Sequence, residues 1–195
     1  IAFHCQLFNI GGEGQAYFAG LGVALVSLYL GDVLPFWLMM PLLIIAAGLF
    51  GAGWAFIPAY LQAKRGSHIV ITTIMFNFIA ASIMAYFLVE VLKPPMSMAP
   101  ESAVFPVSSW IPKMHDFLGA FGYEMTATPL NLTFIFGLIC AVLVWFFLWN
   151  TRWGYEIRAQ GFNPSAAKYA GIDPIKITLL TMAVSGMLAG FFALN

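Results

Sequence analysis

The sequence predicts an all-α membrane protein, a polytopic bundle of transmembrane helices. Two observations carry this prediction. Hydrophobic residues make up 62% of the 195 residues and charged residues 8%, whereas soluble domains contain about 45–50% and about 25% of these classes. The apolar residues also gather in stretches about as long as a bilayer is thick, and a helix can cross a bilayer because it pairs its own backbone groups.

Five stretches reach roughly the 20 apolar residues that one span requires. They are Gly14–Leu30, Phe36–Ile57, Ile69–Leu92, Leu130–Trp149 and Ile175 onward. Apolar residues also precede the first stretch and continue to the last residue. We therefore expect residues 1–195 to form a single transmembrane domain, incomplete at both ends, that belongs to a longer protein.

Small residues four positions apart predict close packing between these helices. Such pairs allow two helix backbones to approach each other inside a membrane. The pairs are Ala16 with Gly20, Ala47 with Gly51, and Gly186 with Gly190. They predict a tight bundle and carry no indication of its function.

The distribution of positive charge predicts which loops face the cytoplasm. The connection Pro58–His68 and the polar stretch 150–174 are separated by two predicted spans, so they lie on one side of the membrane. Together with Lys176 they hold six of the eight lysine and arginine residues. Because cytoplasmic loops carry the excess of these residues, we expect 150–174 to be cytoplasmic and 93–129 to be an external loop.

The external loop is too long for a simple connection. Within it, we predict a short amphipathic helix over Pro112–Phe121 that starts at its proline. Four aromatic residues of this loop suit the interface between lipid and water: Trp110, Phe117, Phe121 and Tyr123. Anchoring in membrane lipid is the more common role of such residues, and a docking surface for a soluble partner is the alternative.

A glycine-rich break precedes the first span. Residues 9–15 read NIGGEGQ and bring three polar side chains, those of Asn9, Glu13 and Gln15, to membrane depth. Irregular backbone survives in a bilayer only where protein or water covers it, and an ionisable residue there is costly. Two interpretations stay open. The polar side chains form a hydrogen-bonded structure that caps the next helix, or they line a translocation pathway.

The third span carries polar side chains at mid-length. Thr73 and Asn77 share a helix face because they are four residues apart, and Thr72 lies beside them. An asparagine inside a span must find hydrogen-bond partners. Bonding to a neighbouring helix is the more common solution, and lining a wet path is the alternative.

Several other classes of function find no support in the sequence. The histidines are scattered without the spacing of metal ligands, so we expect no metal site: His4, His68 and His115. The chain lacks the sequence motifs of hydrolases and metalloproteases, so we expect no catalytic residue. The formal net charge of zero gives no reason to expect a nucleic-acid partner.

Three blocks of sequence resemble the permease subunits of ATP-binding cassette importers. The blocks are FNIGGEGQ over Phe8–Gln15, LQAKRGSHIVITTIMFNFIA over Leu61–Ala80, and TRWGYEIRAQGFNPSAAKYAGI over Thr151–Ile172. More narrowly, they resemble the family that moves simple sugars, nucleosides and branched-chain amino acids. The first block is particularly similar to the nucleoside branch.

The third block resembles the loop that engages the ATPase. Ser165, Ala166 and Ala167, followed by Gly171, are similar to an EAAxxxG pattern, with Ser165 in place of the glutamate. A short helix is predicted here, because proline favours a first helical turn, asparagine caps it and glycine ends it. The resemblance implies ATPase docking by a set that also includes its approach: Arg158, Gly161, Asn163, Pro164, Ser165, Ala166, Ala167 and Gly171.

The resemblance also implies the partners and the location. We expect a multi-pass protein of a bacterial-type cytoplasmic (inner) membrane that works with a second permease subunit, a cytoplasmic ATP-binding cassette subunit and an external solute-binding protein. The nucleoside branch suggests that the second permease is a paralogue. The permease itself would bind no cofactor, because its partner binds ATP. Nucleosides or purines are the expected solutes, with ribose-like sugars as the alternative. A channel or an ion-coupled carrier is the competing class.

Overall fold

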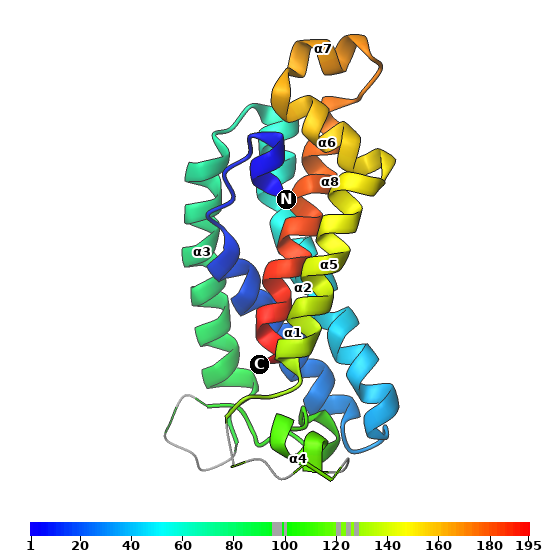
Figure 1. The fold of residues 1–195 in the computed structure, drawn as a ribbon. Coiled ribbons are helices and arrows are strands. Elements are labelled where there is room, and N and C mark those ends of the chain that lie inside the picture. The colour runs from blue at the N-terminus through cyan, green and yellow to red at the C-terminus, as the bar shows by residue number, and fades with distance from the viewer. Residues whose placement is uncertain (95–98, 100, 120–121, 124–125, 127–128) are drawn as a thin grey trace.

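The computed structural model describes residues 1–94, 99, 101–119, 122–123, 126 and 129–195. In these residues the chain forms a bundle of long helices that run side by side (Figure 1). In chain order the helical elements are η1 (Ala2–Cys5), α1 (Gly12–Leu30), α2 (Phe36–Arg65), α3 (Ile69–Tyr86), η2 (Phe87–Val91), η3 (Val107–Ser109), α4 (Met114–Gly119), α5 (Thr133–Asn150), α6 (Arg152–Phe162), α7 (Pro164–Tyr169), α8 (Pro174–Gly190) and η4 (Phe191–Leu194). The predicted all-α fold is confirmed.

Within the described residues, four helical segments are long and apolar enough to cross a membrane: Phe36–Arg65, Ile69–Val91, Thr133–Asn150 and Pro174–Leu194. They correspond to four of the five predicted spans. The fifth, α1, has 19 residues, and its first turn carries Glu13 and Gln15. These two polar residues lower the mean hydropathy of α1, so the span count from length and composition is four.

The predicted loop Pro58–His68 is wrong over most of its length, because α2 continues to Arg65 with Pro58 inside it. A proline interrupts one backbone hydrogen bond, and membrane helices tolerate this where neighbouring helices cover the site. Pro58 is fully buried. The helix ends instead at Gly66, which has a φ of 70° and donates its N–H to the Gln62 carbonyl at 3.0 Å. This left-handed cap suits glycine.

The centre of the bundle is the contact between α2 and α8. A Cβ atom on Gly51 would collide with the Gly186 carbonyl oxygen and would lie 2.9 Å from the Gly190 Cα atom. The two helix backbones therefore touch, as small residues allow. The close packing predicted for the pairs Ala47 with Gly51 and Gly186 with Gly190 is confirmed.

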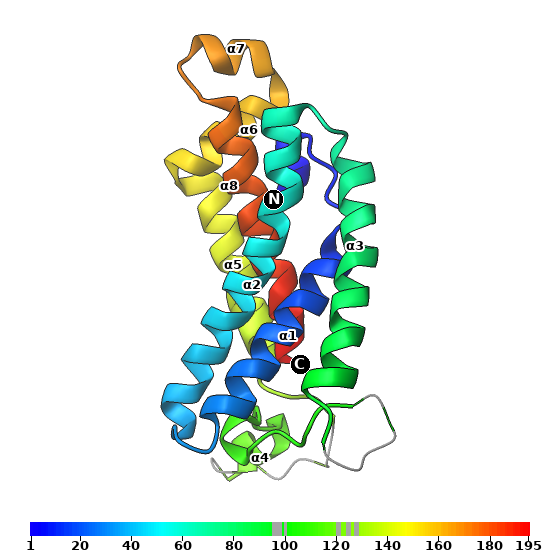
Figure 2. The same ribbon diagram turned by 180° about the vertical axis from the view of Figure 1, so that it is seen from behind.

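The two ends of the bundle carry different elements. The helices α6 and α7 lie at one end and α4 lies at the other, as both views show (Figures 1 and 2). The N-terminal segment η1 lies near α6, and α1 begins at mid-height and runs toward the α4 end. The short helix predicted within Pro112–Phe121 is present as α4, but it begins at Met114 and not at Pro112 as predicted. Residues 120–121 of that prediction lie outside the described residues.

Candidate functional site

The polar break before α1 is held by an asparagine from another helix. Asn77 of α3 accepts a hydrogen bond on Oδ1 from the Gly14 N–H at 2.9 Å and donates from Nδ2 to the Ile10 carbonyl at 3.0 Å. A Cβ atom on Gly14 would lie 2.9 Å from the Asn77 Cα atom, so glycine is required for this approach. The first N–H groups of a helix have no partner within the helix, and Asn77 supplies one.

A second set of bonds ties the break to α8. Asn9 Nδ2 donates to Gln15 Oε1 at 3.1 Å and to Ser185 Oγ at 3.0 Å, while Gln15 Nε2 donates to Asn9 Oδ1 at 3.1 Å. Asn9 Oδ1 also accepts from the Gly11 N–H at 2.9 Å. Gln15 is buried. These two amides bond to each other and hold the irregular backbone, whereas within the described residues neither Glu13 nor Gln15 caps the first turn of α1.

The two threonines of α3 bond within their own helix. The buried Thr73 hydroxyl donates to the Ile69 carbonyl at 2.8 Å and packs beside Gly11, where a Cβ would lie 3.2 Å from the Thr73 Cβ. The Thr72 hydroxyl donates to the His68 carbonyl at 2.8 Å. The structure thus brings Asn9, Gln15, Thr73 and Asn77 together around the break, and Thr72 lies one position away on the helix.

Glu13 differs from the other polar residues of the break, because its side chain is exposed in a groove. The Tyr17 hydroxyl, one turn further along α1, donates to Glu13 Oε1 at 3.0 Å. The groove has a volume of about 590 Å³ and runs between α1, α3 and the end of α8. Its lining residues are Gly12, Glu13, Ala16, Tyr17, Gly20, Met84, Ala189, Phe192, Ala193 and Asn195.

The predicted short helix of the polar stretch is confirmed as α7. Asn163 is its N-cap and accepts a hydrogen bond on Oδ1 from the Ala166 N–H at 3.0 Å, and Pro164 occupies the first turn. Gly171 follows the helix with a φ of 83°, the left-handed conformation that glycine adopts without strain. The short helix α6 joins α5 to α7 and packs beside η1 and α8, and α7 projects beyond the ends of the long helices (Figure 1).

Two residues expected at a docking face point into the protein instead. Ala167 is 3% exposed and belongs to the same apolar cluster as Ile157 and Ile172. A Cβ atom on Gly161 would collide with the His4 carbonyl oxygen and lie 2.9 Å from the His4 carbonyl carbon. A larger side chain at Ala167 would therefore clash within the chain.

The outer face of this end carries two aromatic side chains that the sequence pattern did not single out. Phe162 at the end of α6 is 87% exposed and Tyr169 at the end of α7 is 95% exposed, and Ser165 and Ala166 of α7 are exposed as well. One signal was available in the sequence. An aromatic residue precedes this short polar helix and another occupies its last position. Because so short a helix has too small a core to bury them, they are expected to be exposed.

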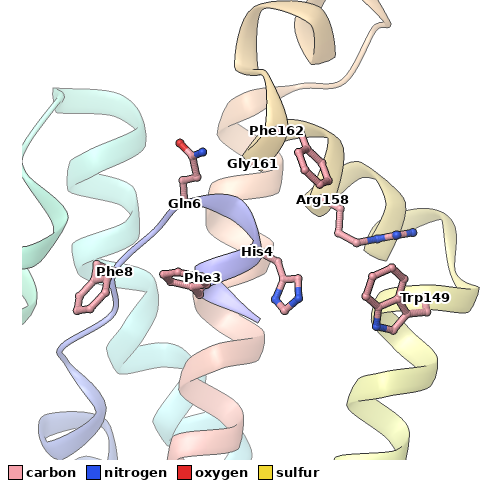
Figure 3. A pocket seen from close by; sticks show the side chains of 8 residues that line it. All are labelled: Phe3, His4, Gln6, Phe8, Trp149, Arg158, Gly161 and Phe162. Carbon is pink, nitrogen blue, oxygen red and sulfur yellow. The ribbon is translucent and has the colours of Figure 1, made fainter.

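Arg158 lies in a pocket between η1 and the junction of α5 and α6 (Figure 3). The pocket has a volume of about 480 Å³, and its lining residues are Phe3, His4, Gln6, Phe8, Trp149, Arg158, Gly161 and Phe162. The Arg158 guanidinium carbon lies 4.3 Å from the centroid of the Trp149 ring, a cation–π contact. Arg158 thus holds the α5–α6 junction and lies apart from α7.

A bundle of bilayer-length helices with a broken helix inside it and a capped helical loop at one end defines a polytopic membrane protein. Residues 1–194 match the family model described as "Branched-chain amino acid transport system / permease component", and the chain belongs to this family. The resemblance to importer permeases is confirmed. Membership of the family, together with the four apolar helices found in the described residues, assigns the chain to the cytoplasmic membrane as a multi-pass protein.

Three curated proteins are similar to this chain over most of its length. The chain is 34% identical over 192 residues to the guanosine ABC transporter permease protein NupP of Bacillus subtilis, covering 97% of this chain and 51% of that protein. It is 32% identical over 199 residues to the nucleoside ABC transporter permease protein NupB of Lactococcus lactis, with the same coverage of 97% and 51%. A glucose ABC transporter permease protein of Haloferax volcanii, TsgB13, is 28% identical over 183 residues, 94% of this chain and 48% of that protein. The chain spans about half the length of these relatives. No solved structure matches it.

Proposed function

We propose that this chain is part of the permease subunit of an ATP-driven importer of nucleosides or purines. The observation that carries the proposal is the identity of 34% and 32% to permeases named for guanosine and for nucleosides, each over 97% of the chain. Sugars are the alternative solutes, since a glucose permease is 28% identical over 94% of the chain.

In this proposal the α6–α7 end of the bundle faces the cytoplasm. Lys64 and Arg65 end α2, and Arg152, Arg158 and Lys168 lie in α6 and α7, all at the same end of the bundle. Cytoplasmic segments of membrane proteins carry the excess of positive residues. The segment 93–129 with α4 then faces outward, where an external solute-binding protein delivers the solute.

The helix α7 is the element that we propose the ATPase grips. Its caps at Asn163 and Gly171 fix a short helix, whose last residue Tyr169 is exposed, and the exposed Phe162 ends α6 just before it. Aromatic side chains bury a large area at low entropic cost and often dominate binding between proteins. ATP is bound by that partner, so the permease needs no cofactor and no ATPase site of its own. A second permease subunit, which the nucleoside branch suggests is a paralogue, completes the pathway.

The contact between α6 and η1 supports a route for the motion of the ATPase. Gly161 lies against the backbone of His4, and η1 leads within a few residues to the break at Asn9 and Gly11. A displacement of α7 and α6 would therefore act directly on the segment that sets the position of Glu13. Neither a channel nor an ion-coupled carrier requires a capped docking helix connected in this way.

The test uses the full-length permease reconstituted in vesicles with its partner permease, ATPase and external binding protein. We expect uptake of radiolabelled guanosine that requires ATP and stops when the ATPase subunit cannot hydrolyse it. Uptake of glucose or ribose without guanosine uptake would favour the sugar alternative. Uptake that continues without ATP hydrolysis would exclude an ATP-driven importer and favour a channel or carrier.

A further inference from the structure

The groove beside α1 contains a carboxylate, that of Glu13, which takes no part in the hydrogen bonds that hold the break. Asn9, Gln15 and Asn77 hold the break through bonds to one another, to Ser185 and to the backbone. Glu13 takes part in none of these bonds. Among the described residues its hydrogen bond comes from Tyr17, a neighbour on the same helix. A charged side chain within a membrane bundle is costly and is retained where function requires it.

The Glu13 carboxylate can accept further hydrogen bonds besides the one from Tyr17. An ionised carboxylate offers about four lone-pair sites on two oxygens. Tyr17 bonds to Oε1, which leaves Oε2 and part of Oε1 open toward the groove. Two adjacent O–H donors match two carboxylate oxygens, and hydrogen bonds to an ionised acceptor are stronger than those between neutral groups.

The shape of the groove suits a small organic solute. Its volume of about 590 Å³ lies within the range of about 300–1,000 Å³ that is typical of small-molecule sites. Gly12, Ala16 and Gly20 repeat every fourth residue along α1 and leave its surface open beside Glu13. Exposed rings of Tyr17 and Phe192 provide aromatic surface in the same groove.

We propose that Glu13, supported by Tyr17, binds two neighbouring hydroxyl groups of the transported solute. This inference rests on the proposed function and adds a chemical class to it: the solute carries a vicinal diol, such as the 2′,3′-diol of a ribonucleoside or the corresponding diol of a free sugar. A free nucleobase lacks these donors, and an anionic solute is repelled by the carboxylate.

The test compares solutes with and without the diol in the reconstituted complex. Uptake of guanosine and of 2′,3′-dideoxyguanosine is measured for the wild type and for Glu13→Gln, each at a concentration that saturates the external binding protein. Expressing each variant as a ratio to wild type for the same solute cancels differences in delivery. Glu13→Gln should lower guanosine uptake about tenfold, equal to ~1.4 kcal/mol. Uptake of the dideoxy analogue should change less than twofold.

Glu90→Gln is the matched control, because Glu90 is an exposed glutamate of η2 outside this groove. It should leave both uptake rates within twofold of wild type. Equal losses for the two solutes in Glu13→Gln, or no loss for either, would overturn the inference. A second arm measures ribose uptake by the wild type and by Glu13→Gln, and a loss confined to guanosine or to ribose identifies a nucleoside or a free sugar as the source of the diol.

A separate measurement keeps the inference testable if Glu13→Gln does not assemble. Ala16→Cys places a thiol in the groove beside Glu13 while the carboxylate stays in place. Labelling by a thiol reagent is compared with the parent chain, which retains Cys5 and Cys140. Guanosine should protect the new thiol and dideoxyguanosine at the same concentration should not. Protection by both or by neither would contradict the diol contact.

The failure of this inference differs from the failure of the proposed function. A wild-type complex that imports guanosine and loses both solutes equally in Glu13→Gln retains the proposed function and loses only the diol contact. A complex that imports neither guanosine nor ribose loses the proposed function itself.

Discussion

Gly161 of α6 lies directly against the backbone of His4 in η1, with no room for a Cβ atom between them. Two segments far apart in the sequence therefore meet without intervening side chains. One of them continues into the capped helix α7 and the other into the polar break before α1. The contact joins the end that we propose the ATPase grips to the part of the bundle that we propose the solute passes.

Gly161→Ala tests this connection. The added Cβ would collide with the His4 carbonyl group and force α6 and η1 apart, at a cost of about 1–3 kcal/mol for overpacking. We expect the complex to assemble, while ATP hydrolysis loses its stimulation by solute and solute-bound binding protein. The control is Gly137→Ala in α5, where an added Cβ would meet nothing within 4 Å. Normal stimulation in Gly161→Ala would show that the contact does not transmit motion.

The aromatic residues at the α7 end should anchor the ATPase. Tyr169→Ala removes a side chain that is 95% exposed in this chain, so the fold should survive. Binding of the ATPase subunit should weaken about tenfold or more, a loss of at least ~1.4 kcal/mol of binding free energy, as is typical of a central interface residue. Binding is measured in detergent with the purified permease. Tyr29→Ala removes a tyrosine that is 72% exposed on α1 and should leave binding unchanged. Wild-type affinity in Tyr169→Ala would argue against this face.

Neighbouring alanines of α7 should respond differently to the same change. Ala167 is buried within the chain and Ala166 is exposed. Ala167→Glu should bury a charge and loosen residues 152–173, seen as faster proteolysis of this segment in the isolated permease. Ala166→Glu should leave proteolysis unchanged and should reduce ATPase binding. Equal proteolysis of the two variants would contradict the inward orientation of Ala167.

The break should depend on Asn77 for its stability. Asn77→Ala leaves the Gly14 N–H and the more exposed Ile10 carbonyl without their side-chain partner. Because Gly14 is buried and an unpaired buried polar group costs about 1–3 kcal/mol, we expect a lower thermal unfolding midpoint in detergent. Thr72→Ala, which removes a bond within α3, is the mild control. A midpoint unchanged in Asn77→Ala would refute the clamp.

The orientation of the bundle is tested by labelling single cysteines with an impermeant reagent. Ser165 lies on the exposed surface of the α7 end, and Val104, 85% exposed, lies in the segment at the opposite end. In intact cells Val104→Cys should label and Ser165→Cys should label only after the membrane is opened. External labelling at Ser165 would reverse the orientation and remove the proposed docking role of α7.

The sequence was sufficient for the spans and for α7, because both depend on local patterns. Apolar length predicts a span, and Asn163, Pro164 and Gly171 each favour a helix boundary wherever they occur. The end of α2 differs from the predicted Ile57, because packing around Pro58 allows the helix to continue to Arg65, where Gly66 caps it. Tertiary contact overrode a local preference there.

The position of the polar break could be predicted from the sequence, but the separate roles of its side chains could not. Asn9, Gln15 and Asn77 become structural only because α1, α3 and α8 meet at this point, and Ser185 is 176 residues from Asn9. Which face of α1 carries Glu13 into a groove also depends on that arrangement. The inward orientation of Ala167 is of the same kind, since it is set by the packing of α7 on its neighbours.

Gly51, Gly186 and Gly190 bring the backbones of α2 and α8 into direct contact at the point where the two helices meet. If α2 rotated or slid along α8, carbonyl oxygens of one helix would collide with Cα atoms of the other. We therefore expect the two helices to move together as one rigid pair. We expect this rigid pair to keep its own shape throughout the proposed transport cycle.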